Sequence, residues 1–281
     1  MKRRVGFIGL GDQGAPIAAA LAEYHDLRVW ARRDASYAAL GAVAFQRMPH
    51  PQALARSVDV LCLCLPGDAE LKALLFTNTV AKELPIGAVV INHGTGDPGA
   101  AAQIADGIGQ MGIGYLDAPV SGGHPGAVER TLTCFVGGME ATLEACRSVI
   151  ECYSRTIILM GGPGSGQMTK LINNILTVSN MRNIVEVLTL AKSAGVDLHA
   201  LQGALAQSSG GSFILQAIGR QIIPEIAEHI AGLNRKDVRE FDEAMGARGL
   251  DAHVIVEWAM AGPDGLPMLV EAITEGREGS P

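Results

Sequence analysis

A glycine-rich hexapeptide lies directly between the first apolar run of the chain, residues 5–8, and a helix-forming segment, residues 15–23. The hexapeptide consists of Gly9, Leu10, Gly11, Asp12, Gln13 and Gly14. In such a G-x-G-x-x-G pattern the first glycine permits a tight turn, the second lets a pyrophosphate approach the backbone, and the third lets helix and strand pack closely. This placement predicts a strand-turn-helix unit with a dinucleotide bound at the helix N-terminus.

Short apolar runs alternate with helical segments through the first half of the chain, at residues 5–8, 27–30, 58–65, 88–92 and 114–117. The alternation predicts a parallel sheet that is covered by helices on both faces. Further runs at residues 131–136 and 156–159 are expected to extend this sheet at its far edge. We therefore assign residues 1–163 to an α/β domain of the Rossmann type, with a doubly wound sheet.

The pattern becomes helical after residue 163. Apolar residues recur at helical spacing from 167 to 194, with Ser165 as the expected N-cap and Gly195 as the expected C-terminal cap. The pattern predicts a long inter-domain helix over residues 164–194, within an all-α domain for substrate and oligomer contacts over residues 164–281. The last residues, 275–281, are expected to be disordered.

Lys170 and Asn174 are four residues apart on the predicted long helix, so their side chains lie on one face. A lysine beside an amide at the start of such a helix is well placed to donate and accept a proton. An isolated helix lysine is most often a solvated side chain. The assignment therefore depends on the other motifs of the chain.

Two arginines, Arg32 and Arg33, follow the second predicted strand, where an NAD-binding domain would carry an acidic residue for the ribose. Guanidinium groups are suited to the 2′-phosphate of NADP because each presents a planar set of donors. The sequence therefore predicts NADP as the cofactor, and Asp34 leaves NAD possible.

Charge and cysteine content exclude several classes of partner. The net charge of −7 argues against nucleic acid or an anionic membrane, and the chain has no apolar run long enough to span a bilayer. The five cysteines form no C-x-x-C pair and the histidines lack metal-ligand spacing, so we expect neither a disulfide framework nor a metal site. We expect a soluble, cytoplasmic protein with a small-molecule substrate.

The motifs of this chain, taken in order, resemble those of the β-hydroxyacid dehydrogenase family, which includes 3-hydroxyisobutyrate dehydrogenase, tartronate semialdehyde reductase and glyoxylate/succinic semialdehyde reductases. The resemblance covers nearly the whole chain. It rests on residues 7–14, 117–123 and 164–174 and on the pair Lys236 and Asp237. It implies an NADP-preferring dehydrogenase or reductase that acts on a small carboxylate-bearing substrate, and a homodimer or homotetramer.

The resemblance also implies a role for individual residues. Lys170 would be the catalytic acid/base and Asn174 would position the substrate. The substrate carboxylate would be bound by Ser121, Gly122 and Gly123, and Lys236 would reach the nicotinamide or the substrate. Besides the glycine-rich hexapeptide and the arginine pair, the cofactor would be bordered by Leu65, Pro66 and Thr95.

The chain departs from the family pattern at Gln13, where methionine is usual, at Gly94, where serine is usual, and at Arg130, where glycine is usual. These departures leave the substrate identity more open than the reaction type. The alternatives are an imine reductase of the same fold, in which the lysine is generally replaced, and a catalytically silent NADP(H)-binding interaction module.

Overall fold

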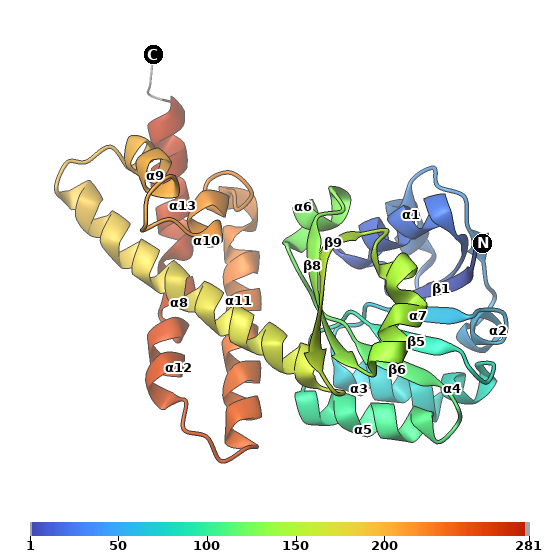
Figure 1. Ribbon diagram of the computed structural model, residues 1–281. Coiled ribbons are helices and arrows are strands. Elements are labelled where there is room, and N and C mark those ends of the chain that lie inside the picture. Colours follow the sequence, from blue (N-terminus) through green and yellow to red (C-terminus); the bar gives the residue numbers. More distant parts are fainter. Residues whose placement is uncertain (1, 279–281) are drawn as a thin grey trace. The chain divides into compact units, whose positions relative to one another are not determined.

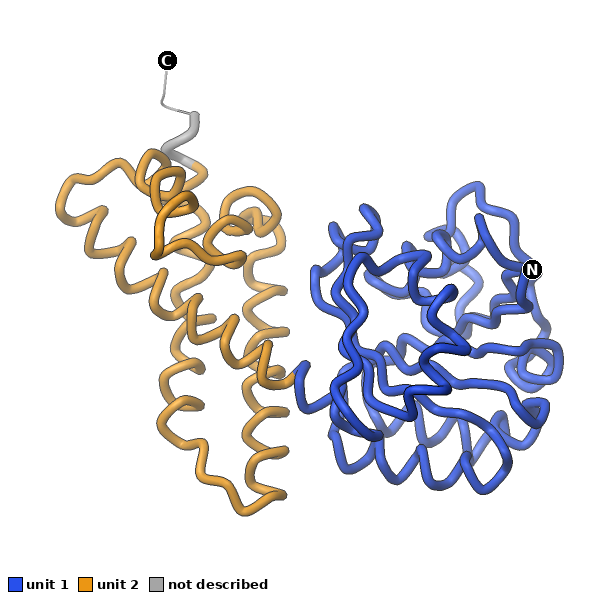
Figure 2. Tube along the Cα trace, viewed as in Figure 1, with its two compact units in different colours: residues 1–170 blue, residues 171–281 orange. Residues whose placement is uncertain are grey.

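A computed structural model describes residues 2–278 of the chain (Figure 1). The chain forms two compact units, residues 1–170 and 171–281, which divide within the long helix α8, Ser165–Ser193 (Figure 2). None of the described helices combines the length and the apolar character that a membrane span requires.

The first unit is built on one sheet, which has nine strands in the described part of the chain. These are β1 Arg4–Ile8, β2 Asp26–Trp30, β3 Gln46–Arg47, β4 Val60–Leu63, β5 Val89–Asn92, β6 Gly114–Asp117, β7 Val120–Ser121, β8 Leu132–Gly138 and β9 Ser154–Gly161. Their order is β3-β2-β1-β4-β5-β6-β8-β7, with β9 paired to β8. The strands from β3 to β6 in this order are all parallel. The direction in which the strands are added reverses between β1 and β4, as in dinucleotide-binding sheets.

Helices cover both faces of this sheet because successive strand residues point to opposite sides. On β4, Val60 and Cys62 pack with α1 (Gly14–Tyr24), α6 (Gly123–Val128) and α7 (Glu140–Ile150). Leu61 and Leu63 pack on the opposite face, under a second set of helices. These are α2 Pro51–Ala55, α3 Asp68–Lys72, η2 Ala73–Thr77, α4 Val80–Glu83 and α5 Pro98–Gly109. The doubly wound α/β prediction is therefore confirmed.

The predicted strands form with small shifts at their ends, and β8 and β9 extend the sheet beyond β6 as expected. The five runs predicted to form a parallel sheet do so, whereas β8, for which no direction was predicted, pairs antiparallel with β6. Strands β3 and β7 were not predicted. Each has only two residues, which is too short to produce an apolar run.

The second unit is helical, and its core joins α8 to α9 (Leu198–Ala206), α10 (Phe213–Ala217), α11 (Pro224–Gly246) and α13 (Gly262–Glu278). The short α12, His253–Met260, precedes α13. The predicted cap at Gly195 is confirmed: its φ is 77°, and the N–H of Val196 donates to the carbonyl of Ala191. The segment expected to be disordered, residues 275–281, begins within α13, which ends at Glu278, and residues 279–281 lie outside the described residues.

Candidate active site

The glycine-rich hexapeptide forms the turn between β1 and α1. A Cβ at Gly9 would lie 2.1 Å from the carbonyl oxygen of Cys64, and one at Gly14 would lie 1.9 Å from the carbonyl oxygen of Gly9. A Cβ at Gly11 would meet nothing within 4 Å. The packing of the protein itself therefore requires the first and third glycines, whereas the second borders open space of the kind that a pyrophosphate needs.

The N-terminus of α1 is available to an anion. Gln13 occupies the N-cap position and makes no side-chain hydrogen bond to the helix, and the first turn carries no acidic residue. Because the first N–H groups of a helix have no partner within the helix, they point toward a phosphate placed there. These residues fit the phosphates of a dinucleotide.

The loop after β2 presents Arg32 and Arg33, which are both exposed. The next residue, Asp34, begins the 3₁₀ helix η1 (Asp34–Leu40) and forms an ion pair with Arg47 of β3. The Arg47 guanidinium also lies 4.4 Å from the centroid of the Tyr37 ring. The acidic residue that left NAD possible is therefore already engaged by a cation.

The predicted substrate-binding residues lie between β6 and α6. Ser121 ends the short strand β7, pairs with Thr133 of β8 and is half-buried. Gly122 and Gly123 have φ angles of 128° and 63°, in the region that favours glycine. Together they turn the chain from β7 into α6, so the hydroxyl and the glycine backbone lie at the end of a strand.

A buried histidine holds the start of this substrate segment. His93, at the end of β5, has Nδ1 2.8 Å from the carbonyl oxygen of Ala118 and Nε2 3.1 Å from the hydroxyl of Tyr153. Because the carbonyl can only accept, Nδ1 carries the proton and Nε2 accepts from the tyrosine. Burial lowers the pKa of His93 to about 4, and the hydrogen bond to Ala118 opposes the shift. The imidazole is therefore neutral near pH 7.

Asp117, at the end of β6, anchors the start of α8. Its Oδ1 accepts the backbone N–H of Gly164 at 2.8 Å, and its Oδ2 accepts that of Gln167 at 2.9 Å. The residue is fully buried; burial raises the pKa of the carboxyl and these hydrogen bonds oppose the rise. The prediction of Ser165 as N-cap is wrong, because its hydroxyl donates back to the carbonyl of Gly162 while Asp117 receives the helix N–H groups.

The predicted acid/base, Lys170, is half-buried on α8, one turn after the residues that Asp117 anchors. Asn174 follows one turn later in the same helix; it is buried, and its Oδ1 accepts from the side-chain amide of Asn173 at 3.3 Å. Lys236 is exposed on α11, with Nζ 3.0 Å from Oε1 of Glu240. Asn174 and Lys236 belong to the second unit, and Lys170 ends the first.

Most predicted site residues belong to the first unit, where they follow the carboxyl ends of parallel strands. The hexapeptide follows β1, Arg32 follows β2, Leu65 and Pro66 follow β4, and Thr95 follows β5. Because parallel strands end at one edge of a sheet, these residues share that edge. Gln167, His93 and Arg47 were not predicted as parts of this region. Their types and positions are unremarkable until the fold brings their partners to them.

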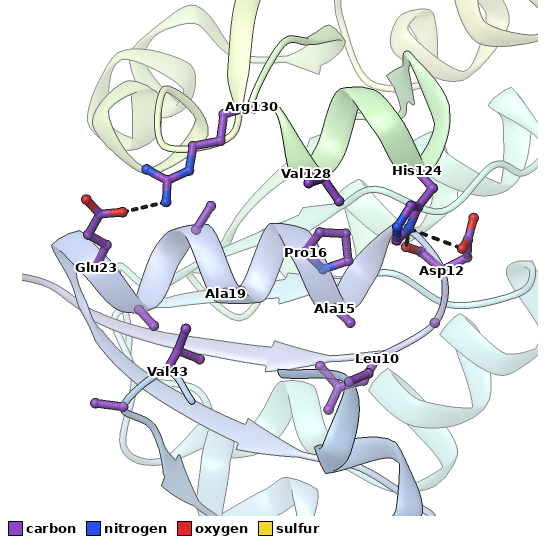
Figure 3. Close-up of a pocket in the computed structure, with 15 residues that line it drawn as sticks. Leu10, Asp12, Ala15, Pro16, Ala19, Glu23, Val43, His124, Val128 and Arg130 are labelled. Carbon is purple, nitrogen blue, oxygen red and sulfur yellow. Dashed lines mark hydrogen bonds and ion pairs between the residues drawn. The ribbon is translucent and has the colours of Figure 1, made fainter. Parts of the chain in front are cut away.

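A groove of about 870 Å³ runs along α1, starting near the sheet edge at which the parallel strands end (Figure 3). Its ends are marked by His124, whose Nδ1 lies 2.7 Å from the carbonyl oxygen of Asp12, and by the ion pair between Arg130 and Glu23. Of the predicted site residues, only Leu10, Gly11 and Asp12 line it. The groove is therefore mainly a feature of the outer surface of α1.

Arg130, which stands where glycine is usual, has a φ of 58° although it is not a glycine. Its guanidinium pairs with Glu23 and lies 5.9 Å from the centroid of the Tyr24 ring, both at the end of α1. The side chain therefore fastens the turn between α6 and β8 to α1. A φ in this range strains the backbone of a residue other than glycine.

The described residues contain no group of three or more histidine, cysteine, aspartate or glutamate residues that could hold a metal ion. All five cysteines are unpaired.

Comparison with protein families gives two adjacent matches. Residues 4–162 match the NAD binding domain of 6-phosphogluconate dehydrogenase, and residues 164–258 match the NAD-binding domain of NADP-dependent 3-hydroxyisobutyrate dehydrogenase.

Individual relatives agree with these matches. The 2-hydroxy-3-oxopropionate reductase of Escherichia coli is 33% identical over 78% of this chain and 76% of its own length. The 2-(hydroxymethyl)glutarate dehydrogenase of Eubacterium barkeri is 31% identical over 76% and 72%. The fold is similar to that of Mycobacterium tuberculosis 3-hydroxyisobutyrate dehydrogenase solved with L-serine, with a TM-score of 0.83, 24% identity, and coverage of 99% of this chain and 100% of that one.

Proposed function

The chain belongs to the 3-hydroxyisobutyrate dehydrogenase family of NAD(P)-dependent β-hydroxyacid dehydrogenases, and we propose that it is an NADP-preferring member. It transfers hydride between the nicotinamide and a small hydroxyacid or semialdehyde. One observation carries the proposal above the others: Asp117 joins the start of α8, and with it the turn before Lys170, to the end of β6. Lys170 and the segment from Ser121 to Gly123 then belong to one nucleotide-binding unit.

The nicotinamide supplies or receives the hydride, and the protein handles the proton. When a carbonyl is reduced, negative charge develops on its oxygen, and Lys170 donates a proton to that oxygen. In the oxidation direction Lys170 removes the proton from the hydroxyl. A positioned acid/base of this kind contributes about 10²- to 10⁴-fold to the rate.

The other proposed roles concern orientation. Ser121, Gly122 and Gly123 bind the substrate carboxylate with a hydroxyl and backbone groups, because a glycine turn lets an anion approach the chain closely. Asn174 orients the substrate through its uncharged amide. Lys236 contacts the nicotinamide or the substrate with its ammonium group.

Preference for NADP is supported by the loop after β2. Arg32 and Arg33 are exposed and suited to the 2′-phosphate, while the neighbouring acidic residue, Asp34, is paired with Arg47. Leu65 and Pro66 border the adenosine and Thr95 borders the nicotinamide. The phosphates lie against the backbone of Gly9, Leu10, Gly11, Asp12, Gln13 and Gly14.

We further propose that residues 1–163 bind NADP, and that residues 164–281 carry substrate contacts and a homodimer or homotetramer interface. Large apolar side chains that are more than half exposed in the second unit support the interface: Leu176, Val187, Leu190, Phe213, Leu250, Val254 and Met268. Light scattering at micromolar concentration tests this, and a monomeric mass contradicts it. The unpaired cysteines are in keeping with a reducing, cytoplasmic location.

Two alternatives make different predictions. In imine reductases of this fold the lysine is generally replaced, so Lys170 argues against this alternative. A silent NADP(H)-binding module would bind the cofactor without turnover and would need neither Lys170 nor Asn174.

A substrate panel separates these readings. Hydroxyacids are offered with NADP⁺ or NAD⁺, and semialdehydes and cyclic imines with NADPH or NADH, while the absorbance of reduced nicotinamide is followed. The proposal predicts turnover of at least one hydroxyacid–semialdehyde couple, faster with the phosphorylated cofactor. Turnover of imines alone would favour the imine reductase, and NADPH fluorescence changes without any turnover would favour the silent module.

A further inference from the structure

The side chain of Gln167 is tied to the backbone of a neighbouring loop by both ends of its amide. Its Nε2 donates to the carbonyl oxygen of Gly94 at 2.7 Å, and its Oε1 accepts the N–H of Gly96 at 2.9 Å. The side chain is only 1% exposed. The two bonded residues flank Thr95, which is the residue proposed to border the nicotinamide.

Gln167 also belongs to the anchored first turn of α8. Its own N–H donates to Asp117, and Lys170 follows three residues later, so the two side chains are neighbours on the helix surface. One residue therefore connects the end of β6, the loop after β5 and the turn that carries Lys170. All of these parts lie within the first unit.

The loop that Gln167 holds is also fixed at its two ends, where the N–H of Gly94 donates to Oδ1 of Asn92 at 3.1 Å and the N–H of Asp97 donates to Oδ2 of Asp68 at 2.7 Å. It contains glycine at positions 94 and 96, and glycine is the most conformationally free residue. Neighbouring residues pack closely against both glycines of the loop. A Cβ at Gly94 would lie 2.6 Å from the carbonyl oxygen of Leu65, and one at Gly96 would lie 2.2 Å from Oδ1 of Asp68. Gln167 supplies the opposing contact.

We propose that Gln167 is a positioning residue that fixes the position of the loop around Thr95 relative to Lys170. The inference rests on the proposed function, because this relative position matters only if the loop borders the nicotinamide and Lys170 transfers the proton. Misplacement of reacting groups by about 1 Å can cost on the order of 100-fold in rate. A loss of this contact therefore lowers kcat more than it lowers cofactor affinity.

Gln167→Glu gives the sharpest test, because glutamate has the same shape but donates a hydrogen bond only when it is protonated. At low pH the carboxylic acid reproduces both contacts, whereas the ionised carboxylate faces the carbonyl oxygen of Gly94 without a donor. We expect the ratio of kcat for this variant to kcat for the wild type to rise as pH falls. Gln167→Leu, which removes both contacts at every pH, should lower kcat about 10- to 100-fold without this dependence.

Ser165→Ala is the matched control, since Ser165 lies on the same turn and its hydroxyl donates to the nearby carbonyl of Gly162. It should keep kcat within about twofold of the wild type, well short of the loss expected from misplacement. NADPH affinity, measured by fluorescence, should change little in all three variants.

Three results overturn the proposal: a glutamate variant whose kcat ratio is independent of pH, a folded leucine variant with wild-type kcat, or equal losses in the serine control. If the leucine variant does not fold, the glutamate pH series decides alone. A wild-type protein that turns over no hydroxyacid or semialdehyde overturns the proposed function and this inference together. An active wild type with unaffected Gln167 variants overturns only the inference.

Discussion

Oδ2 of Asp117 lies 2.9 Å from the backbone nitrogen of Gln167, so a carboxylate at the end of a strand receives a helix N–H group across a long stretch of chain. The other carboxylate oxygen receives the N–H of Gly164 in the same way. Capping residues normally lie beside the helix they cap. Here the cap is part of the segment that leads to Ser121, so the start of α8 and the proposed substrate-binding turn are one connected structure.

Asp117→Ala should be among the more destabilising substitutions in the first unit. It leaves two buried N–H groups without an acceptor, and each such loss costs roughly 1–3 kcal/mol. Asp97→Ala is the matched control, because Asp97 caps α5 locally through the N–H of Ala100 and its loss costs about 1 kcal/mol. Urea unfolding of both variants measures the difference. A smaller loss at Asp117 than at Asp97 would contradict the anchoring role.

His93 should make the protein less stable in acid. Its folded pKa of about 4 lies below the unfolded value near 6.5, so between these pH values the unfolded chain binds a proton that the folded chain does not. Stability from this group is therefore fully present above pH 6.5 and is lost as pH falls toward 4, by up to about 3 kcal/mol.

The double variant His93→Leu, Tyr153→Phe isolates this effect, because it removes both hydrogen-bonding partners and leaves the carboxylates unchanged. Urea unfolding from pH 7 to pH 4.5 should show a shallower loss of stability in the double variant than in the wild type. Parallel curves would mean that another group governs the acid sensitivity.

Arg130 should respond differently to replacement by alanine and by glycine. Arg130→Ala loses the contact with Glu23 and keeps a side chain at a φ of 58°, whereas Arg130→Gly relieves the backbone strain. We expect the glycine variant to be more stable than the alanine variant by about 1 kcal/mol. Thermal unfolding compares them directly, and an alanine variant of equal or greater stability would show that the turn is not strained.

Cofactor preference should depend on the loop after β2. Charge-assisted contacts of Arg32 and Arg33 with the 2′-phosphate predict that Arg32→Ala, Arg33→Ala weakens NADPH binding by about tenfold or more and leaves NADH nearly unchanged. Arg47→Ala should move preference toward NADH, because it frees Asp34. Arg56→Ala, which removes an arginine paired with Glu83 on the outside of the same unit, is the control. Equal losses for both cofactors would reject the assignment.

The fold could be predicted because the sequence patterns that specify it involve residues that are close together in the chain. The turn between β1 and α1, the apolar strands and the cap at Gly195 each depend on a few neighbouring residues. The true cap of α8 could not be predicted in this way, since Asp117 reaches Gln167 only after β6 and α8 have met. Gln167 and His93 were missed for the same reason, as their partners lie in other loops. The sequence shows Arg130 as a departure from the family pattern, whereas its contact with α1 is visible only in the structure.

Proton transfer by Lys170 during hydride transfer is measured by the kcat of Lys170→Ala with the substrate found in the panel. We expect kcat to fall about 10²- to 10⁴-fold while NADPH still binds, and Lys170→Arg to restore little because a guanidinium does not release its proton. A Lys170→Ala enzyme that keeps more than about a tenth of the wild-type kcat, well short of that loss, would contradict it.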